Sequence, residues 1–574
     1  MKINIVQDKV AQISLSTLVQ QKITTLGKPG QILDRPFVLR KTRTRSGNPP
    51  SGHHGIRMRG RECDEYLLNC SSVQDRLDQL TICLVLRLMS TQTRGFCGAW
   101  AILSCRYAIP SHLRGPAHES ELQEFWEHAV ARNVLQHPML QVGLIDLDSK
   151  KPAWVQLDSV DLSHHIEWQV IDSPEDYEES LNKNIEYQLD FKFTNLETRP
   201  GWRMVVRKLS VDNMLEVLFV WNHPNLDGTG AKIFHQTLLE TLNTMEISTA
   251  IKLDEETLKN HVLKTTVTAE NIPPTQEATT KQRTSRDAAA TAAWKENKPA
   301  ASSKNTFPSA EWLPIRSVPY ATQLRTLTID NSTLQGALAA CRAHKTTITG
   351  LLNGIAFVSL ASQLPEQYLS GMTGETALDM RRFTPLGPPG YEWLQPDKSV
   401  SIFVSKMHHE LDESTVSKVK RLAQAASSGQ EQMSALEDVL WSASVAVREE
   451  IKDRLDAELK NDDISMMKSV GDWRNYMQDA TKKPRESLWI VTNLGVLDGN
   501  PLATSGDHEK GWSIRRAKFT VCAHAVGCFF CISAIAVKGG ELSIDVSWPD
   551  NIADAGIGEQ LMSDIQSWLK YVKA

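Results

Sequence analysis

The sequence predicts a mixed α/β (α+β) fold made of two globular halves. First, its 574 residues exceed the usual length of a single domain, which is roughly 100–200 residues. Second, apolar runs typical of strands and apolar stripes typical of helices alternate from about residue 95 onwards. Third, Thr, Ala, Lys, Pro and Ser dominate residues 263–310, as in a solvated crossover between two folded units.

These observations divide the chain into four segments. Residues 1–85 place many arginines among Pro, Gly and His with little apolar periodicity, so we expect a disordered basic extension rather than a nucleic-acid or membrane tether. Residues 86–262 form the first folded half, residues 263–310 the linker, and residues 311–574 the second folded half.

The apolar periodicity predicts the elements of both halves. In the first half we expect strands at 101–108, 139–145, 153–157, 202–208 and 214–221, and helices around 122–130 and 233–242. In the second half we expect strands at 322–329, 375–381, 399–404, 489–493, 519–526, 529–537 and 542–548. Helices are expected at 334–344, 348–364, within 413–467 and at 557–572, with a hairpin turn at 538–541.

The composition excludes several classes of protein. With 63 basic and 68 acidic side chains the formal net charge is −5, which is too balanced for nucleic-acid binding by the whole surface. Nine cysteines in a chain this long do not indicate a disulfide framework. The longest apolar stretch, residues 519–537, contains His524 and predicts two buried strands rather than a membrane helix. Because the first residues also lack the pattern of a signal peptide, we expect a cytoplasmic protein.

The most informative segment is the apolar run 215–221 followed by the sequence NHPNLDG at 222–228. It places His223 where a buried strand turns toward a helix, and a rigid scaffold at such turns often aims catalytic side chains. His408 and Asp412 have the same spacing without the following Gly, and we interpret them as a solvated helix start.

Other chemistries find less support in the sequence. It contains no G-x-S-x-G nucleophile elbow and no phosphate-binding P-loop. Cys528 and Cys531 have CxxC spacing, but they lie in an apolar strand with no second pair nearby. This setting favours core cysteines over a zinc or redox site.

The NHPNLDG segment resembles the HxxxDG motif of the chloramphenicol-acetyltransferase-like superfamily. The segments CRAHKTT at 341–347, ALDMRRFTP at 377–385, VTNLGVLD at 491–498 and IAVKGGELSIDVSW at 535–548 are similar to the fungal alcohol acetyltransferase branch. The resemblance covers roughly residues 95–574. Condensation domains of the superfamily carry a second His where this chain has Asn222, and plant members carry a DFGWG element that is absent here.

The resemblance implies two chloramphenicol-acetyltransferase-like domains with the active site at their interface. It implies that His223 is the general base, and that Asp227 points away from substrate and pairs with an arginine. Arg381 is the first candidate for this partner and Arg382 the second. Thr492 and Asn493 are candidate oxyanion donors, while the residues that bind CoA remain unassigned.

The function implied is CoA-dependent transfer of an acetyl group to a small-molecule alcohol, as a tailoring step in fungal secondary metabolism. Acetyl-CoA would be a co-substrate, and we expect no permanently bound cofactor, no metal, no nucleic-acid partner and no integral membrane segment. We expect a monomer. The alternatives are a catalytically inactive member that acts as a binding module and a condensation-type domain that forms amides or esters.

The composition of residues 1–85 predicts where the chain is open to proteolysis. A segment with few periodic apolar positions buries too little surface to offset the entropy lost on ordering. Limited proteolysis should therefore cut first between Arg40 and Arg61 and leave a stable core, as mass spectrometry of the fragments would show. A truncated protein starting after Arg61 should stay soluble and active; an insoluble or inactive product would show that the basic segment belongs to the fold.

Overall fold

The computed structural model describes residues 100–147, 149, 152–171, 176–209, 213–247, 253–276, 313–316, 321–365, 370–458, 479–485, 487–499, 511–524 and 526–572. All of them belong to one compact unit, Asn69–Ala574. The second unit, Met1–Leu68, and the whole of the expected basic extension 1–85 lie outside the described residues.

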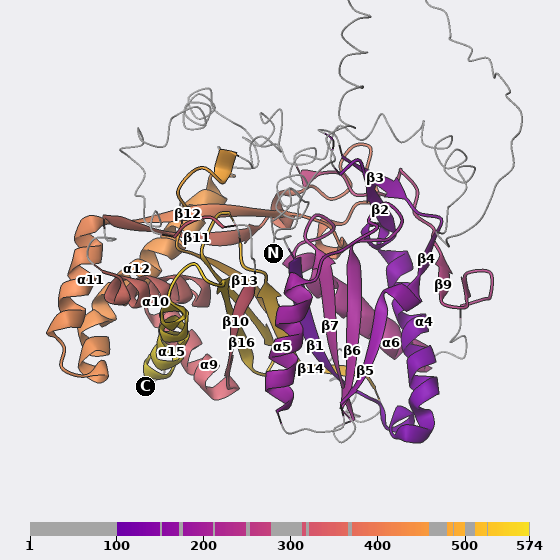
Figure 1. Ribbon diagram of the computed structural model, residues 1–574, viewed down its shortest axis with the longest axis horizontal. Coiled ribbons are helices and arrows are strands. Elements are labelled where there is room, and N and C mark those ends of the chain that lie inside the picture. Colours follow the sequence, from indigo (N-terminus) through magenta and orange to yellow (C-terminus); the bar gives the residue numbers. More distant parts are fainter. Residues whose placement is uncertain are drawn as a thin grey trace, which may run out of the picture. The chain divides into compact units, whose positions relative to one another are not determined.

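The first sheet has five strands in the order β14-β1-β7-β6-β5 (Figure 1). In that order the strands are Ser513–Val521, Trp100–Ala108, Met214–Asn222, Trp202–Leu209 and Ile166–Ile171. Neighbours are antiparallel except β5 and β6, which run parallel. Helices α4 (Glu119–Gln136) and α6 (Gly228–Ile247) pack with one face of the sheet, and α5 (Tyr177–Asp190) packs with the other. The central strand β7 is therefore apolar along nearly its whole length, because both of its faces are buried.

The second sheet has six strands in the order β10-β16-β15-β13-β11-β12. In that order the strands are Thr322–Ile329, Leu542–Pro549, Phe530–Val537, Trp489–Leu497, Gly371–Asp379 and Val404–Asp412. The strand β13 runs parallel to both of its neighbours, and the other pairs are antiparallel. The second core also contains helices α9 (Asn331–Ala343), α10 (Ile348–Gln363), α11 (Glu413–Ala425), α12 (Gly429–Asp456) and α15 (Ala555–Tyr571).

Short elements complete the described residues. The strands β2 (Val142–Ile145) and β3 (Ala153–Gln156) form a hairpin-like pair, and β4 (Ser159–Asp161), β9 (Val262–Lys264) and β8 (Leu258–Lys259) form a small sheet. The 3₁₀ helices are η3 (Ser111–Leu113), η4 (Pro116–His118), η5 (Pro138–Leu140), η6 (Leu162–His164), η9 (Arg381–Phe383) and η10 (Pro396–Lys398).

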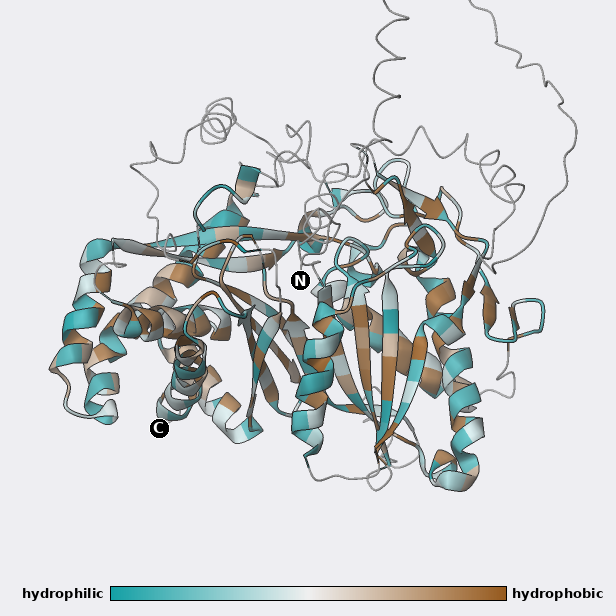
Figure 2. Ribbon diagram, in the orientation of Figure 1, coloured by the Kyte–Doolittle hydropathy of each residue, from teal (hydrophilic) through white to brown (hydrophobic). Residues whose placement is uncertain are grey.

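Helix α10 is the centre of the second core. It is buried on every side from Gly350 to Ala361, which explains its almost continuous apolar sequence. A Cβ atom at Gly354 would lie 2.9 Å from the carbonyl oxygen of Leu440 on α12, so the absence of a side chain there allows the two helices to approach closely. Apolar residues follow the strands of both sheets, while the helices that cover them show mixed colouring (Figure 2). No helix among the described residues is long and apolar enough to cross a membrane.

Strand β14 crosses from one half of the sequence to the sheet of the other. It lies within the segment 311–574, yet it pairs antiparallel with β1 at the edge of the first sheet, from Ala101–Val521 to Ala108–Ser513. The next strand along the chain, β15, returns to the second sheet between β13 and β16. The two sheets are therefore interlocked through the backbone and do not separate at the linker.

Most predicted elements coincide with observed ones. The strand predicted at 519–526 is displaced, because β14 occupies 513–521 and the chain leaves the sheet after Val521. The strand predicted at 399–404 is wrong, because β12 occupies 404–412, and the predicted helix start at His408 lies within this strand. Asp412 instead caps α11 by accepting a hydrogen bond from the backbone N–H of Thr415 at 2.8 Å. The elements β5 and α5 were not predicted, since α5 carries few apolar residues among many charged and amide side chains.

The expected linker 263–310 begins inside β9. Leu263 and Val267 are buried, and the described part of the first half continues to Gln276, which is also buried. The fold therefore extends past the boundary expected at residue 262. Residues 277–310 lie outside the described residues.

Candidate active site

The candidate site begins at the end of the central strand of the first sheet. His223 directly follows Asn222, the last residue of β7, and α6 begins at Gly228. Backbone hydrogen bonds fix the turn between them: the N–H of Asn222 donates to the carbonyl of Gly201 at 2.7 Å, and the N–H of Asn225 donates to the carbonyl of Asn222 at 2.9 Å. Because β7 is buried between two neighbours, it holds the turn that carries His223 in a fixed place.

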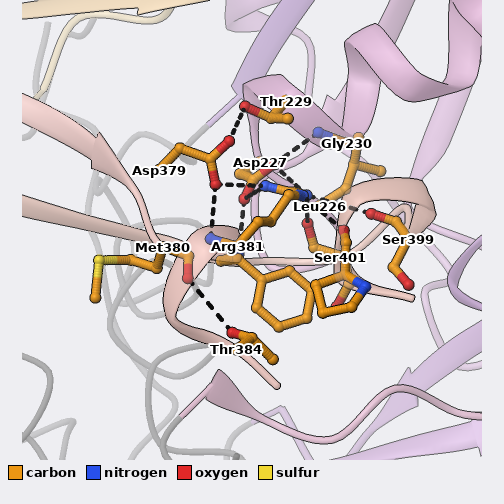
Figure 3. Close-up of polar contacts among 12 residues, drawn as sticks. Leu226, Asp227, Thr229, Gly230, Asp379, Met380, Arg381, Thr384, Ser399 and Ser401 are labelled. Carbon is orange, nitrogen blue, oxygen red and sulfur yellow. Dashed lines mark hydrogen bonds and ion pairs between the residues drawn. The ribbon is translucent and has the colours of Figure 1, made fainter. Parts of the chain in front are cut away.

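The carboxylate of Asp227 is buried and fully hydrogen-bonded (Figure 3). Its Oδ1 accepts from the N–H of Gly230 at 2.7 Å and from Nη2 of Arg381 at 2.9 Å. Its Oδ2 accepts from Nη1 of Arg381 at 2.8 Å and from the N–H of Phe403 at 2.7 Å. A carboxylate with four donors has no capacity left for substrate, so Asp227 holds the first turn of α6 and the loop before it.

Arg381 connects that loop to the second half of the chain. It lies in η9, directly after β11, and its guanidinium also donates to the backbone carbonyls of Pro396, Ser399 and Ser401 at 3.1, 3.2 and 3.1 Å. A further contact joins its Nη1 to Oδ1 of Asp379 at 3.3 Å. One planar side chain thus positions the turn of the first half and the segment before β12 together, which suits the rigid fork of arginine.

The structure distinguishes the two arginines that the sequence offered as partners of Asp227. Arg381 is buried, and Arg382 is exposed with its guanidinium beside the ring of Phe383. Burial opposes the charge of Arg381, but the carboxylates of Asp227 and Asp379 outweigh it and raise the pKa of the guanidinium. The guanidinium of Arg381 therefore stays charged.

His223 sits in an environment that keeps its imidazole neutral. Its Nδ1 is buried and has no hydrogen bond to any other described residue. Burial lowers the pKa of His223 below its ordinary value, and the charge of His524 acts in the same direction. The backbone carbonyl of His223 and the carboxylate of Asp227 oppose this shift without reversing it. A neutral imidazole near pH 7 is the form that accepts a proton in catalysis.

Asn222 is a second polar side chain at this turn, and the sequence singled it out only as a departure from a motif. It is fully buried, and neither amide atom has a hydrogen-bond partner within the described parts of the chain. Buried polar groups are normally hydrogen-bonded, so this amide points to a polar partner at the turn. The signal in the sequence was a polar residue at the end of an apolar strand.

The second half contributes β13 to the same region. The Nζ of Lys232 on α6 donates to the carbonyl of Leu494 at 2.9 Å, and a Cβ at Gly228 would lie 2.7 Å from Cδ2 of Leu494. The two predicted oxyanion donors, Thr492 and Asn493, directly precede this contact.

The two predicted donors differ in whether their side chains already make hydrogen bonds within the protein. The amide of Asn493 is engaged, because its Nδ2 donates to Oγ1 of Thr349 at 3.1 Å and its Oδ1 accepts from the N–H of Gly495 at 2.9 Å. Thr492 is half-buried, and its hydroxyl makes no hydrogen bond with a described residue. Thr492 is therefore the better placed of the two to bind a ligand oxygen.

The connection from β14 to β15 and the start of β15 contain a cluster of His524, Cys528 and Cys531. The sequence predicted only that the two cysteines lie in the core. Cys528 and Cys531 are indeed buried, and Nδ1 of His524 lies 3.3 Å from Sγ of Cys528. Burial opposes protonation of His524, but the sulfur of Cys528 raises the pKa of the imidazole. A hydrogen bond from Cys531 and the charge of His524 lower the pKa of the Cys528 thiol. The CxxC spacing was visible in the sequence, whereas the histidine four residues before it gave no separate signal.

The fold and the site together define a class of protein. Strand β14, which follows β13 in the chain, completes the first sheet, and a turn histidine with a buried carboxylate–arginine pair lies where α6 meets β13. This is the architecture of the chloramphenicol-acetyltransferase-like and condensation-domain acyltransferases. The solved structure of the trichothecene 15-O-acetyltransferase TRI3 from Fusarium sporotrichioides matches with a TM-score of 0.59 at 13% identity, covering 86% of this chain and 94% of that chain. The condensation domain of the monacolin K polyketide synthase MokA matches with a TM-score of 0.50 at 9% identity, covering 86% and 96%.

Within this class the chain belongs to the alcohol acetyltransferase family, whose model matches residues 156–563. It is 28% identical over 458 residues to the probable alcohol acetyltransferase FCK4 of Fusarium pseudograminearum, covering 79% of this chain and 86% of that protein. It is 19% identical over 454 residues to the probable alcohol acetyltransferase crmB of Aspergillus fumigatus, covering 77% and 89%.

The Asp227–Arg381 pair generates a prediction about stability. Removing one partner leaves the other charge buried and unpaired, so Asp227→Ala and Arg381→Ala should each destabilise the protein by about 3–5 kcal/mol. The double variant should cost clearly less than the sum, and urea unfolding of all three proteins measures this difference. The matched control is Arg382→Ala, which should stay within about 0.5 kcal/mol of the parent. Strict additivity of the two single changes would mean that the pair is not coupled.

Proposed function

We propose that this chain transfers an acetyl group from acetyl-CoA to the hydroxyl group of a small-molecule alcohol, with His223 as the general base. The observation that carries the proposal is the pairing of a neutral turn histidine with an aspartate whose carboxylate is fully engaged elsewhere. Asp227 is then a positioning residue, and His223 is the group that meets the acceptor.

The chemistry follows from the ring nitrogens of His223. Because Nδ1 is buried, we assign Nε2 as the nitrogen that takes the proton of the acceptor hydroxyl. As the proton leaves, the acceptor oxygen attacks the thioester carbon and negative charge develops on the former carbonyl oxygen. The carbon–sulfur bond then breaks, and the imidazolium returns its proton to the CoA thiolate. The products are an acetyl ester and free CoA, and His223 is neutral again.

We propose Thr492 as the donor that meets the developing oxyanion, with Asn493 as the second candidate. The hydroxyl of Thr492 makes no hydrogen bond with a described residue. On β13 it lies two residues before Leu494, whose carbonyl contacts Lys232 of α6. One such donor typically contributes about 3 kcal/mol to transition-state stabilisation.

Family membership supports the alcohol as acceptor, and the relatives FCK4 and crmB are both named probable alcohol acetyltransferases. We further propose that the acceptor is a hydroxylated product of fungal secondary metabolism. Comparing the metabolites of a deletion strain with those of its parent would name the acceptor, since one non-acetylated alcohol should accumulate.

Two other functions make different predictions. A condensation-type domain would use a carrier-bound acyl group and ignore free acetyl-CoA, and Asn222 in place of a second histidine weighs against it. An inactive binding module would release no thiol with any alcohol. The test is to incubate the purified protein with acetyl-CoA and a panel of alcohols and to follow free thiol. Thiol release that depends on the alcohol supports the proposal, and its absence with the alcohol identified by metabolite profiling contradicts it.

The first prediction from this mechanism concerns His223. His223→Ala should lower turnover by roughly 10²–10⁴-fold, because the proton then has no positioned acceptor. Circular dichroism should show an unchanged fold. The control is His164→Ala, since His164 lies at the exposed end of η6 and should not affect turnover. Near-full activity of a folded His223→Ala protein would remove His223 from the mechanism.

The second prediction concerns pH. Only the neutral imidazole accepts a proton, and the pKa of His223 is lowered by burial. With an acceptor that does not titrate, kcat/KM should therefore keep its plateau below pH 6.5, the ordinary pKa of histidine, and fall only at more acid pH. A fall of kcat/KM that begins above pH 6.5, and that only His223→Ala removes, would contradict this prediction. It would mean that the site stabilises the charged form of His223.

A further inference from the structure

Three soft metal-binding side chains meet at the connection between the two sheets. Nδ1 of His524 lies 3.3 Å from Sγ of Cys528, and Sγ of Cys528 lies 3.7 Å from Sγ of Cys531. One ligand atom from each of the three residues lies within 4.8 Å of the others. Within the described residues, no other group of His, Cys, Asp and Glu side chains gathers in this way.

These separations match a tetrahedral zinc site. Zinc binds thiolate sulfur at about 2.3 Å and imidazole nitrogen at about 2.0–2.1 Å, which at tetrahedral angles separates two sulfurs by about 3.8 Å and sulfur from nitrogen by about 3.6 Å. The distances of 3.3 Å from Cys528 to His524 and 3.7 Å from Cys528 to Cys531 are close to these values. The ligand atoms of His524 and Cys531, which lie within 4.8 Å, would have to be about 3.6 Å apart in the loaded site. Two thiolates also neutralise a divalent cation, so the loaded site would bury no net charge.

Contacts to the backbone position the three ligand residues and leave their ligand side chains available for a metal ion. Nη1 of the buried Arg485 donates to the carbonyls of His524, Gly527 and Cys528 at 3.1, 3.2 and 3.2 Å. Gly527 has φ of +98°, a conformation that favours glycine, and it turns the chain so that Cys528 faces His524. Cys531 lies on β15 and is fixed by the sheet.

A fourth protein ligand is not needed. The nearby Cys522 uses its Sγ to accept a hydrogen bond from the backbone N–H of Trp100 at 3.2 Å. Three protein ligands and one water form a familiar zinc arrangement, and soft sulfur ligands favour zinc over magnesium or calcium.

We propose that His524, Cys528 and Cys531 bind one zinc-class divalent ion whose fourth ligand is water. The ion would join the end of β14, a strand of the first sheet, to β15, a strand of the second. Its role is structural: it fixes the crossover between the sheets close to the turn of His223. This inference does not depend on the proposed acetyl transfer.

Cobalt provides a direct probe of the site. The reduced, metal-free full chain is titrated with Co²⁺ without oxygen, and visible and near-ultraviolet absorption is recorded. We expect about one equivalent to produce sulfur-to-cobalt charge-transfer bands and the d–d bands of a tetrahedral ion, and we expect zinc to displace the cobalt. Cys528→Ser and Cys531→Ser should lose the charge-transfer bands, and His524→Ala should weaken binding at least tenfold. The control Cys341→Ser alters a buried cysteine of α9 and should leave the titration unchanged.

A thermal measurement keeps the proposal falsifiable if one variant folds poorly. Zinc should raise the Tm of the parent chain and of Cys341→Ser in proportion to the logarithm of its concentration, and it should not raise the Tm of Cys531→Ser. No tetrahedral cobalt spectrum in the reduced parent chain would overturn the proposal. Charge-transfer bands that survive in both Cys528→Ser and Cys531→Ser would also overturn it, because the metal would then bind elsewhere.

Discussion

The geometry of the candidate site depends on one buried ion pair, between Asp227 of the first half and Arg381 of the second. Its two parallel hydrogen bonds are 2.8 and 2.9 Å long, and each partner makes further bonds to the backbone around it. Asp227 thereby holds the first turn of α6, and Arg381 holds the segment that leads into β12. The position of His223 is therefore a property of the assembled halves. A fragment that contains the histidine motif but lacks η9 would not define it.

The same pair explains why the acid next to the histidine is not its electrostatic partner. In a catalytic triad a carboxylate orients the imidazole and stabilises its charged form. Here both oxygens of Asp227 are occupied, so its effect on His223 does not overcome the effect of burial. This environment thus keeps the imidazole of His223 neutral, and the carboxylate of Asp227 serves to hold the surrounding backbone. Since burial is the largest cause of the lowered pKa of His223, access of water to the turn would control how readily this imidazole accepts a proton.

Local pattern was sufficient to predict much of the fold and the centre of the site. The apolar run before Asn222 and the glycine after Asp227 identified the strand, the turn and the helix. The resemblance ranked Arg381 before Arg382 as the partner of Asp227, and the ion pair confirms that order. Composition alone could not have separated these neighbouring arginines, because the course of η9 decides which one faces inward. His524 was recognised only as a polar residue within an apolar run. Its proximity to Cys528 and Cys531 depends on the turn at Gly527. The sheet to which β14 belongs could not be predicted either, since its partner β1 lies at the other end of the folded chain.

The exchange of β14 between the sheets also limits how this architecture can evolve. Two linked domains that fold separately can be duplicated, swapped or recombined at the connection between them. Here a cut near residue 300 would give a first half with β1 exposed as an unpaired edge, and a second half with a strand that has no sheet to join. New members of such a lineage should therefore arise by substitutions and loop insertions within an intact pair of halves. Chimaeras between relatives would have to take 513–521 from the same parent as the first sheet.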